Sequence, residues 1–237
     1  MKYAIISAGT GSRLAQEGVS VPKPLVRIDG KAMIDRLIDI FVRQGAEEID
    51  IIINDEVEET KQHVRALQQR LSVPLRVIVQ TTPSSMHSFH ALSPYLKDNR
   101  FCLTTVDTIF REEEFAEFIT SFMQSDADGM MAVTDYIDDE KPLYISTTRD
   151  MDITGFHDTK VPDCKYISGG IYCLTPHSID VLQQCIDRGM SRMRNLQRSL
   201  VEAGLHLKAY PFSKILDVDH VHDIEMAETF LRETATK

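Results

Sequence analysis

Apolar positions divide the first two-thirds of the chain into short continuous runs that alternate with segments of helical spacing. Residues 49–53 form a fully apolar run, which is typical of a strand covered on both faces. Residues 31–44 repeat apolar side chains on one side of a helix. The same reasoning predicts strands at 3–7, 49–53, 75–79 and 101–105, and helices at 31–44, 58–71, 85–96 and 112–124. Strands that alternate with helices predict a parallel sheet with right-handed crossovers.

The rhythm changes after residue 124, where strands follow one another with little helix between them. Strands are expected at 130–136, 143–147, 152–156, 166–174 and 205–211, and helices at 176–188, 192–203 and 221–232. A (β/α)₈ barrel would need about eight strand–helix units, and the alternation breaks too early for that. The pattern predicts an α/β protein of a single domain, residues 1–237. We expect a three-layer αβα sandwich with a mixed, mostly parallel central sheet and a Rossmann-like N-terminal half.

Composition and charge limit the classes of molecule that we expect the protein to bind. The chain has 26 Lys and Arg against 36 Asp and Glu, a net charge of −10, so we expect no broad basic face for nucleic acid. Hydrophobic residues make up 43% and charged residues 26%, as in folded soluble proteins. The sequence contains neither an apolar run of the roughly 18–20 residues that cross a bilayer nor a signal-peptide pattern, so we expect a cytoplasmic protein without membrane contact. Its four cysteines form no Cys-x-x-Cys pair, which favours reduced core thiols over a zinc site or a catalytic thiol.

A glycine-rich loop, residues 7–14, follows the first expected strand. Glycines at a strand end let backbone N–H groups approach phosphate closely. Leu14 and Asn54 stand where a dinucleotide-binding loop needs a third glycine and an acidic residue, and the Gly-Lys-Ser/Thr of a Walker loop is missing. Arg13 and Lys23 instead suit a clamp that holds a triphosphate from two sides. Taken alone, the loop fits a tight turn with a surface arginine equally well.

The stretch Ala8-Gly9-Thr10-Gly11-Ser12-Arg13-Leu14, followed by Pro22-Lys23-Pro24-Leu25, resembles the signature of the sugar-phosphate nucleotidylyltransferases. Residues 31–34, 103–110, 168–172 and 217–224 resemble later motifs of that family, in the same order. The resemblance implies a glycosyltransferase-A-like fold and an enzyme that joins a nucleoside triphosphate to a sugar 1-phosphate and releases pyrophosphate. Residues 1–125 would then form the nucleotide-binding half and residues 126–237 the acceptor-binding half. The residues implied are Ala8, Gly9, Thr10, Gly11 and Ser12 for the nucleotide, Arg13 and Lys23 for catalysis, and Gly169 and Gly170 for the acceptor.

Three aspartates are candidate ligands of Mg²⁺. Asp107 follows an apolar strand, where ligand sites of open parallel sheets lie, and carboxylate oxygens suit this cation. The resemblance implies a second ligand in the tail, for which Asp219 is preferred and Asp217 is the alternative. A helix N-cap is the other interpretation of Asp107. The neighbouring His220-x-His222 pair would suit a zinc hydrolase, but no other histidine lies at ligand spacing nearby.

The segment after Gln80 departs from the family pattern. Residues 81–89 replace the usual Gly-Thr-Ala-type loop and resemble the corresponding segment of the phosphocholine cytidylyltransferases of the same superfamily. We expect Gln80 and Ser85 to contact the nucleotide, and residues 83–89 to line the base or acceptor pocket. A solvated strand end is the alternative for Gln80.

The family's Glu-Lys-Pro segment is also missing, because Gly155-Phe156 is followed by other residues. In many relatives that lysine binds the acceptor phosphate. Lys160 and Lys165 are candidates to replace it, and plain surface lysines are the alternative for both.

Three functions therefore remain open. The first is a sugar-1-phosphate nucleotidylyltransferase that uses Mg²⁺, a nucleoside triphosphate and a sugar phosphate. The second is a phosphocholine-type cytidylyltransferase, or an enzyme that uses another small phosphate acceptor. The third is a catalytically silent, nucleotide-sensing regulatory subunit, against which the presence of all the candidate phosphate and metal residues argues. The nucleobase, the acceptor and the existence of a homo-oligomer are left open.

Overall fold

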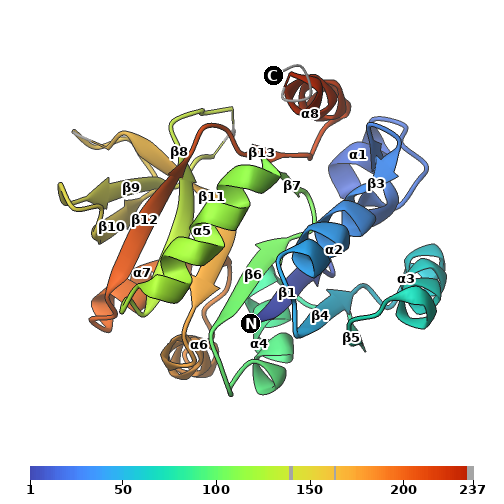
Figure 1. Cartoon of the computed structure of the whole chain (residues 1–237). Coiled ribbons are helices and arrows are strands. Elements are labelled where there is room, and N and C mark those ends of the chain that lie inside the picture. The colour runs from blue at the N-terminus through green and yellow to red at the C-terminus, as the bar shows by residue number, and fades with distance from the viewer. Residues whose placement is uncertain (139–140, 163, 234–237) are drawn as a thin grey trace.

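A mixed central sheet forms the middle layer of the computed structural model, which describes residues 1–138, 141–162 and 164–233 (Figure 1). Within these residues it has nine strands: β1 (Lys2–Ser7), β4 (Glu48–Ile53), β5 (Leu75–Val79), β6 (Phe101–Thr105), β8 (Gly129–Thr134), β9 (Tyr144–Thr147), β10 (Ile153–His157), β11 (Tyr166–Leu174) and β12 (Leu207–Phe212). The order is β10-β9-β11-β6-β1-β4-β5, and β8 pairs with both β11 and β12.

The direction of the strands differs between the two halves of the chain. Strands β6, β1, β4 and β5 pair in parallel, as the alternating N-terminal pattern predicts. Strand β11 runs antiparallel to β6, β8 and β9, while β12 pairs in parallel with β8. The mixed sheet expected from the change of rhythm after residue 124 is therefore confirmed.

Helices cover both faces of the sheet. Three of them, α2 (Met33–Arg43), α3 (Glu58–Arg70) and α5 (Glu112–Gln124), share a hydrophobic core with Tyr3 and Ile5 of β1. The opposite core contains Ala4 and Ile6 together with α4 (Ser85–Leu92), α6 (His177–Asp187) and α7 (Met193–Glu202). Successive side chains of a strand point to opposite faces, so one apolar strand supplies both cores. The three-layer αβα sandwich predicted from the sequence is thus confirmed.

Small elements at one end of the sheet form a third hydrophobic cluster. They are the helices α1 (Ser12–Gln16) and α8 (Val221–Arg232), a 3₁₀ turn Lys23–Leu25, and the strand pairs β2 (Arg27–Ile28) with β3 (Lys31–Ala32) and β7 (Thr108–Ile109) with β13 (Leu216–Asp217). Leu14, Val26, Val218 and Phe230 are buried in this cluster. Figure 1 shows α8, close to the C-terminal end, beside the N-terminal elements α1 and β3. The cluster joins the two ends of the chain.

The predicted long helices and strands agree with the structure except near their ends. The helix expected at 85–96 ends at Leu92, and a 3₁₀ turn, Ser93–Tyr95, completes the segment because Pro94 has no N–H for a continuing helix. The helix expected from residue 31 begins at Met33, since Lys31 and Ala32 pair with β2. The short elements of the third cluster were not predicted, because two-residue strands have no periodicity.

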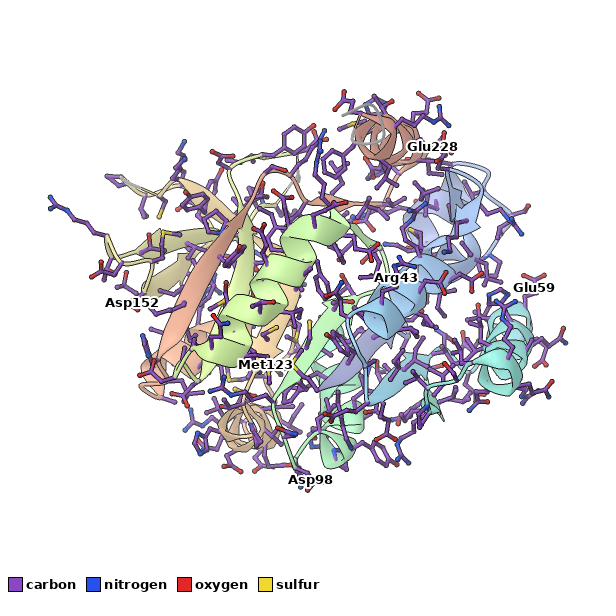
Figure 2. The ribbon with its side chains drawn as sticks, in the orientation of Figure 1. Arg43, Glu59, Asp98, Met123, Asp152 and Glu228 are labelled. Carbon is purple, nitrogen blue, oxygen red and sulfur yellow. The ribbon has the colours of Figure 1, made fainter. Side chains whose placement is uncertain are left out.

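Charged side chains project from the outer side of α3, as Figure 2 shows for Glu59. Arg43 of α2 donates hydrogen bonds of 2.5 and 2.7 Å to Glu112 of α5 and so ties neighbouring helices together. In the described parts of the chain, all four cysteines are buried and free. No helix among these residues is long and apolar enough to cross a membrane.

Candidate active site at the carboxyl ends of the parallel strands

The glycine-rich loop connects β1 to α1 at the carboxyl edge of the parallel sheet. Gly11 is the N-cap of α1 and has φ of 62°, a conformation that favours glycine. A Cβ atom at Gly11 would lie 2.7 Å from Cβ of Lys23. Glycine at this position therefore serves two purposes, because it permits the turn and lets Lys23 pass directly behind the loop.

Lys23 gathers two carboxylates from distant parts of the chain. The 3₁₀ turn Lys23–Leu25 directs its ammonium group to Oδ2 of Asp107, which follows β6, and to Oδ1 of Asp219, at 2.6 Å. Arg13 of α1 donates a hydrogen bond to the other oxygen of Asp219. The structure thus brings together four residues that the sequence named as candidates, from three separate segments.

Strand pairing and helix capping hold the C-terminal segment, residues 216–223, at this site. Strand β13 pairs with β7, and the N–H of Val218 donates a 3.0 Å hydrogen bond to the carbonyl of Asp107. Asp223, in the first turn of α8, accepts hydrogen bonds from the N–H groups of Asp219 (2.8 Å) and His220 (2.6 Å). Asp223 therefore completes a capping box at the start of α8 and fixes the backbone that carries Asp219.

Glu17 is a residue of this site that the sequence analysis missed. Its carboxylate lies 2.5 Å from Nδ1 of His220 and accepts a 2.7 Å hydrogen bond from the N–H of Val221. The end of α1 is thereby joined to the start of α8. Its only sequence signal is an acidic residue after the glycine-rich loop, and a long-range contact of that kind has no local pattern.

Opposite charges dominate the electrostatics of the site. Burial alone would lower the pKa of Lys23, but the charges of Asp107 and Asp219 outweigh burial and raise that pKa. Burial would raise the pKa of Asp107, whereas the charge and hydrogen bond of Lys23 hold it below its usual value. Oδ1 of Asp107 is buried and accepts no hydrogen bond from any described residue. The carboxylate of Asp107 is therefore ionised, and one of its two oxygens stays unused.

A cavity of about 530 Å³, cavity A, opens between the glycine-rich loop and the start of α4. Its lining includes all five predicted nucleotide-loop residues, namely Ala8, Gly9, Thr10, Gly11 and Ser12. Arg13, Lys23, Asp107 and Asp219 line it as well. In an open α/β sheet, ligands bind at the carboxyl ends of the strands, where this cavity lies.

Hydroxyl groups form the opposite wall of cavity A. Thr81, Thr82, Ser84 and Ser85 line it, whereas the side chain of Gln80 is exposed and is not part of the lining. Thr82 and Ser88 are joined by a 2.6 Å hydrogen bond between their hydroxyls. The part of the 81–89 segment that faces the cavity therefore consists of residues 81–85 and Ser88, all of which except Pro83 carry a hydroxyl group.

A second cavity of about 240 Å³, cavity B, adjoins the first and shares Ser85, Thr105 and Asp107 with it. Gly170 lines cavity B and has φ of 74°. The remaining lining residues include Ser168, Tyr172 and Gln197, with Arg192 and Arg194 from the start of α7. Gly169 lines a smaller neighbouring cavity, where a Cβ atom would collide with Ile215.

The two lysines that were predicted to bind the acceptor phosphate lie outside cavities A and B. Lys165 is 3.3 Å from Asp135 in an ion pair and lies over the ring of Tyr166. Lys160 is exposed in the turn after β10. Neither side chain is part of the lining of cavity A or cavity B.

The two tail aspartates occupy different places. Asp219 lines cavity A beside Asp107, whereas Asp217 lines cavity B and does not line cavity A. Asp107 and Asp219 both reach the same ammonium group, so their oxygens are close enough to share one cation. Within the described residues, no group of three His, Cys, Asp or Glu side chains is arranged to hold a metal ion. A cation here would therefore take further ligands from a substrate, as Mg²⁺ does with phosphates.

Residues 3–201 match the family model of the MobA-like NTP transferase domain. The chain belongs to this family. A curated relative that matches over the whole chain is a UTP–glucose-1-phosphate uridylyltransferase, which agrees with the resemblance seen in the sequence. The glycine-rich loop and the strand-end aspartate Asp107 both lie within the matched residues.

Two relatives are similar to this chain in sequence, and one solved structure is similar to it in fold. The bifunctional protein GlmU of Thermodesulfovibrio yellowstonii is 23% identical over 253 residues, which cover 100% of this chain and 53% of that protein. The UTP–glucose-1-phosphate uridylyltransferase AglF of Haloferax volcanii is 24% identical, with 100% of this chain and 99% of the relative covered. The inositol-1-phosphate CTP transferase of T. maritima superposes with a TM-score of 0.80 at 18% identity and covers 98% of this chain and 96% of its own. The chain thus spans about half of the first relative and nearly all of the second.

Proposed function

We propose that the protein is a nucleotidylyltransferase that joins a nucleoside triphosphate to a sugar 1-phosphate and releases pyrophosphate. The observation that carries the proposal is the convergence of Arg13, Lys23, Asp107 and Asp219 on the edge of cavity A. Two cations and two carboxylates around a glycine-rich loop suit the phosphates of a nucleotide and a bound metal ion. In this proposal residues 1–125 supply most of the nucleotide site, and residues 126–237 supply most of the acceptor site.

The reaction is an in-line displacement at the α-phosphorus. An oxygen of the acceptor phosphate forms the new P–O bond, and the bond to the bridging oxygen of the β-phosphate breaks, so pyrophosphate leaves with that electron pair. The attacking oxygen is already an anion, so no strong general base is needed. Arg13, Lys23 and the N–H groups of the loop offset the charge of two polyanions that meet in a protein of net charge −10.

Asp107 and Asp219 fit a Mg²⁺ ion that also binds the nucleotide phosphates. The fit rests on their shared approach to one ammonium group and on the unused, buried Oδ1 of Asp107. Bound there, Mg²⁺ would neutralise phosphate charge and polarise the α-phosphoryl group. Lys23 bridges the two carboxylates, so a metal ion would compete with this side chain for their oxygens.

The lining of cavity B supports a hydroxylated acceptor rather than phosphocholine. Ser168, Gln197 and Asp217 offer hydrogen-bonding groups that suit sugar hydroxyls. Quaternary ammonium groups are bound in cages of several aromatic rings. Among the described lining residues of cavity B, only Tyr172 is aromatic.

Pyrophosphate release from a matrix of nucleotides and acceptors tests the proposal. The matrix combines ATP, CTP, GTP and UTP with glucose, galactose, mannose and N-acetylglucosamine 1-phosphates, with phosphocholine as the contrasting acceptor. We expect Mg²⁺-dependent release that requires both a nucleotide and a sugar 1-phosphate. Release only with phosphocholine would replace the sugar acceptor, and nucleotide binding without release in any mixture would favour the regulatory subunit.

A further inference from the structure

We propose that Arg192 binds the phosphate group of the acceptor, an inference that rests on the nucleotidyl transfer proposed above. Arg192 is exposed and lines cavity B, which shares Ser85, Thr105 and Asp107 with cavity A. The acceptor phosphate must lie where the two cavities meet, because its oxygen attacks the α-phosphorus of the nucleotide. A positive charge on the cavity B side would bring this second anion next to the triphosphate.

The other positively charged side chains that line cavities A and B already have hydrogen-bond partners. Arg194 also lines cavity B, but it donates hydrogen bonds to Asp158 (2.6 Å) and to the carbonyl of Lys141 (2.9 Å). Arg13 and Lys23 are bonded to the carboxylates of cavity A. The guanidinium of Arg192, by contrast, forms no ion pair or hydrogen bond with any residue that the structure describes. Its charge is therefore available to a ligand.

The backbone holds Arg192 at the rim of the cavity. Arg192 has φ of 70° and ψ of 137°, a region that favours glycine. Its N–H donates a 3.2 Å hydrogen bond to the hydroxyl of Ser84, a residue of the cavity A wall. This bond ties the start of α7 to the segment that lines the nucleotide cavity. An arginine thus stands where the local backbone suits glycine, as is often seen for binding residues that the surrounding structure constrains.

A guanidinium group suits a terminal phosphate because two of its N–H groups can bind two oxygens at once. This geometry is shared by sugar 1-phosphates and by other small phosphate monoesters, so Arg192 would recognise the phosphate and the rest of cavity B would select the attached group. The loss of Arg192 should therefore weaken every acceptor and leave the nucleotide unaffected.

The test is steady-state pyrophosphate release by the variants Arg192→Ala, Arg192→Lys and Arg192→Gly, with the acceptor that the wild type uses best in the matrix above. We expect Arg192→Ala to lower kcat/KM for the acceptor by roughly 10²-fold while KM for the nucleotide changes less than about twofold. Lysine keeps the charge but loses the bidentate geometry, so it should restore part of the loss. Arg188→Ala, an exposed arginine at the end of α6 outside both cavities, is the matched control.

Arg192→Gly separates a binding role from a structural one. Glycine relieves the unfavourable φ, so this variant should melt at or above the wild-type temperature and still lose acceptor affinity. A structural role alone would not combine retained stability with a selective rise in acceptor KM. An unchanged acceptor KM in folded Arg192→Ala, with an active wild type, overturns the inference and leaves the proposed function standing. A wild type that releases no pyrophosphate in any mixture removes both.

Discussion

At the scale of single residues, Lys23 is the central ion of the site, because it contacts both carboxylates. Its ammonium group bridges Asp107 and Asp219, and the pKa of Lys23 is raised while that of Asp107 is lowered. Each ion thus stabilises the charged form of the other, and the site keeps two carboxylates close together at neutral pH. Binding of metal and nucleotide would exchange these partners, with carboxylates turning to the metal and cations to the phosphates.

Loss of either phosphate-facing cation should reduce turnover without unfolding the protein. We expect Arg13→Ala and Lys23→Ala each to lower kcat/KM for the nucleotide by roughly 10²-fold or more, because each removes a charge-assisted contact to phosphate. Steady-state pyrophosphate release measures the effect, and thermal melting checks the fold. Lys61→Ala on α3, which removes a surface ion pair with Glu58, is the control. Normal turnover in a folded variant would contradict the role assigned to that residue.

Substitutions of the three candidate aspartates should have different effects, according to the cavity that each side chain lines. Asp107→Asn and Asp219→Asn remove charge but little volume, so we expect them to abolish Mg²⁺-dependent pyrophosphate release while the protein remains folded. Asp217→Asn should retain this activity and change KM for the acceptor, since Asp217 lines cavity B. Titration of release with Mg²⁺ distinguishes the three variants. Wild-type activity that survives a chelator, or full activity in Asp107→Asn, would show that no metal acts there.

At the scale of elements, the site depends on how short segments are joined. The glycine-rich loop, the 3₁₀ turn that carries Lys23 and the β7–β13 pair meet in the third hydrophobic cluster, and Glu17 links α1 to the start of α8. None of these short segments would be stable in isolation, because two-residue strands and a one-turn helix form few hydrogen bonds. Packing between them positions the charged groups.

Gly11→Ala should displace Lys23 and so lower activity more than stability. Gly11 and Gly18 both have positive φ, 62° and 92°, but a Cβ atom would touch Lys23 only at Gly11 and would meet nothing within 4 Å at Gly18. Both alanine variants therefore carry similar backbone strain, of about 1 kcal/mol. We expect kcat/KM for the nucleotide to fall about tenfold or more in Gly11→Ala and to change little in Gly18→Ala. Equal activities in the two variants would show that the close approach of Lys23 to Gly11 does not affect catalysis.

At the scale of the whole molecule, the excess of acidic residues affects stability as well as substrate binding. Asp50 of β4 is fully buried, and its Oδ1 accepts a 3.0 Å hydrogen bond from Arg76. Burial, with a contribution from the charge of Glu48, raises the pKa of Asp50 from 3.8 to about 6. Between these values the folded protein binds more protons than the unfolded chain, so this group makes stability fall as pH rises through that window.

Asp50→Asn should therefore stabilise the protein more at high pH than at low pH. The amide keeps the size of the side chain and removes the buried charge, so we expect the melting temperature at pH 8 to rise by about 2–4 °C, with a smaller gain at pH 5, which lies inside the titration window. Thermal melts from pH 5 to pH 8 measure the difference. Asp98→Asn, at the exposed site labelled in Figure 2, should be neutral throughout. A gain that does not depend on pH would contradict a titrating Asp50.

The sequence alone predicted a mixed, mostly parallel sheet between two layers of helices and named the candidate residues of the site. Apolar runs covered on both faces and helical spacing are local patterns, so residues 49–53 and 112–124 predicted β4 and α5 closely. The loop motif and the strand-end aspartate named the candidates Arg13, Lys23 and Asp107, since such groups are required by phosphate chemistry wherever the chain places them. Helix ends were less accurate because Pro94 and the Lys31–Ala32 pairing override the apolar pattern locally.

Only the tertiary structure decided how those residues meet. Lys23 and Asp219 are 196 positions apart, and nothing in their local sequence specifies a 2.6 Å contact. The separation of Asp217 from Asp219, the location of Lys160 and Lys165 away from both cavities, and the presence of Arg192 at the rim of cavity B all follow from long-range packing. The local periodicity of apolar residues shows which face of a helix or strand is buried. A binding site depends instead on which elements lie next to each other. That arrangement is set by the free energy of the whole fold.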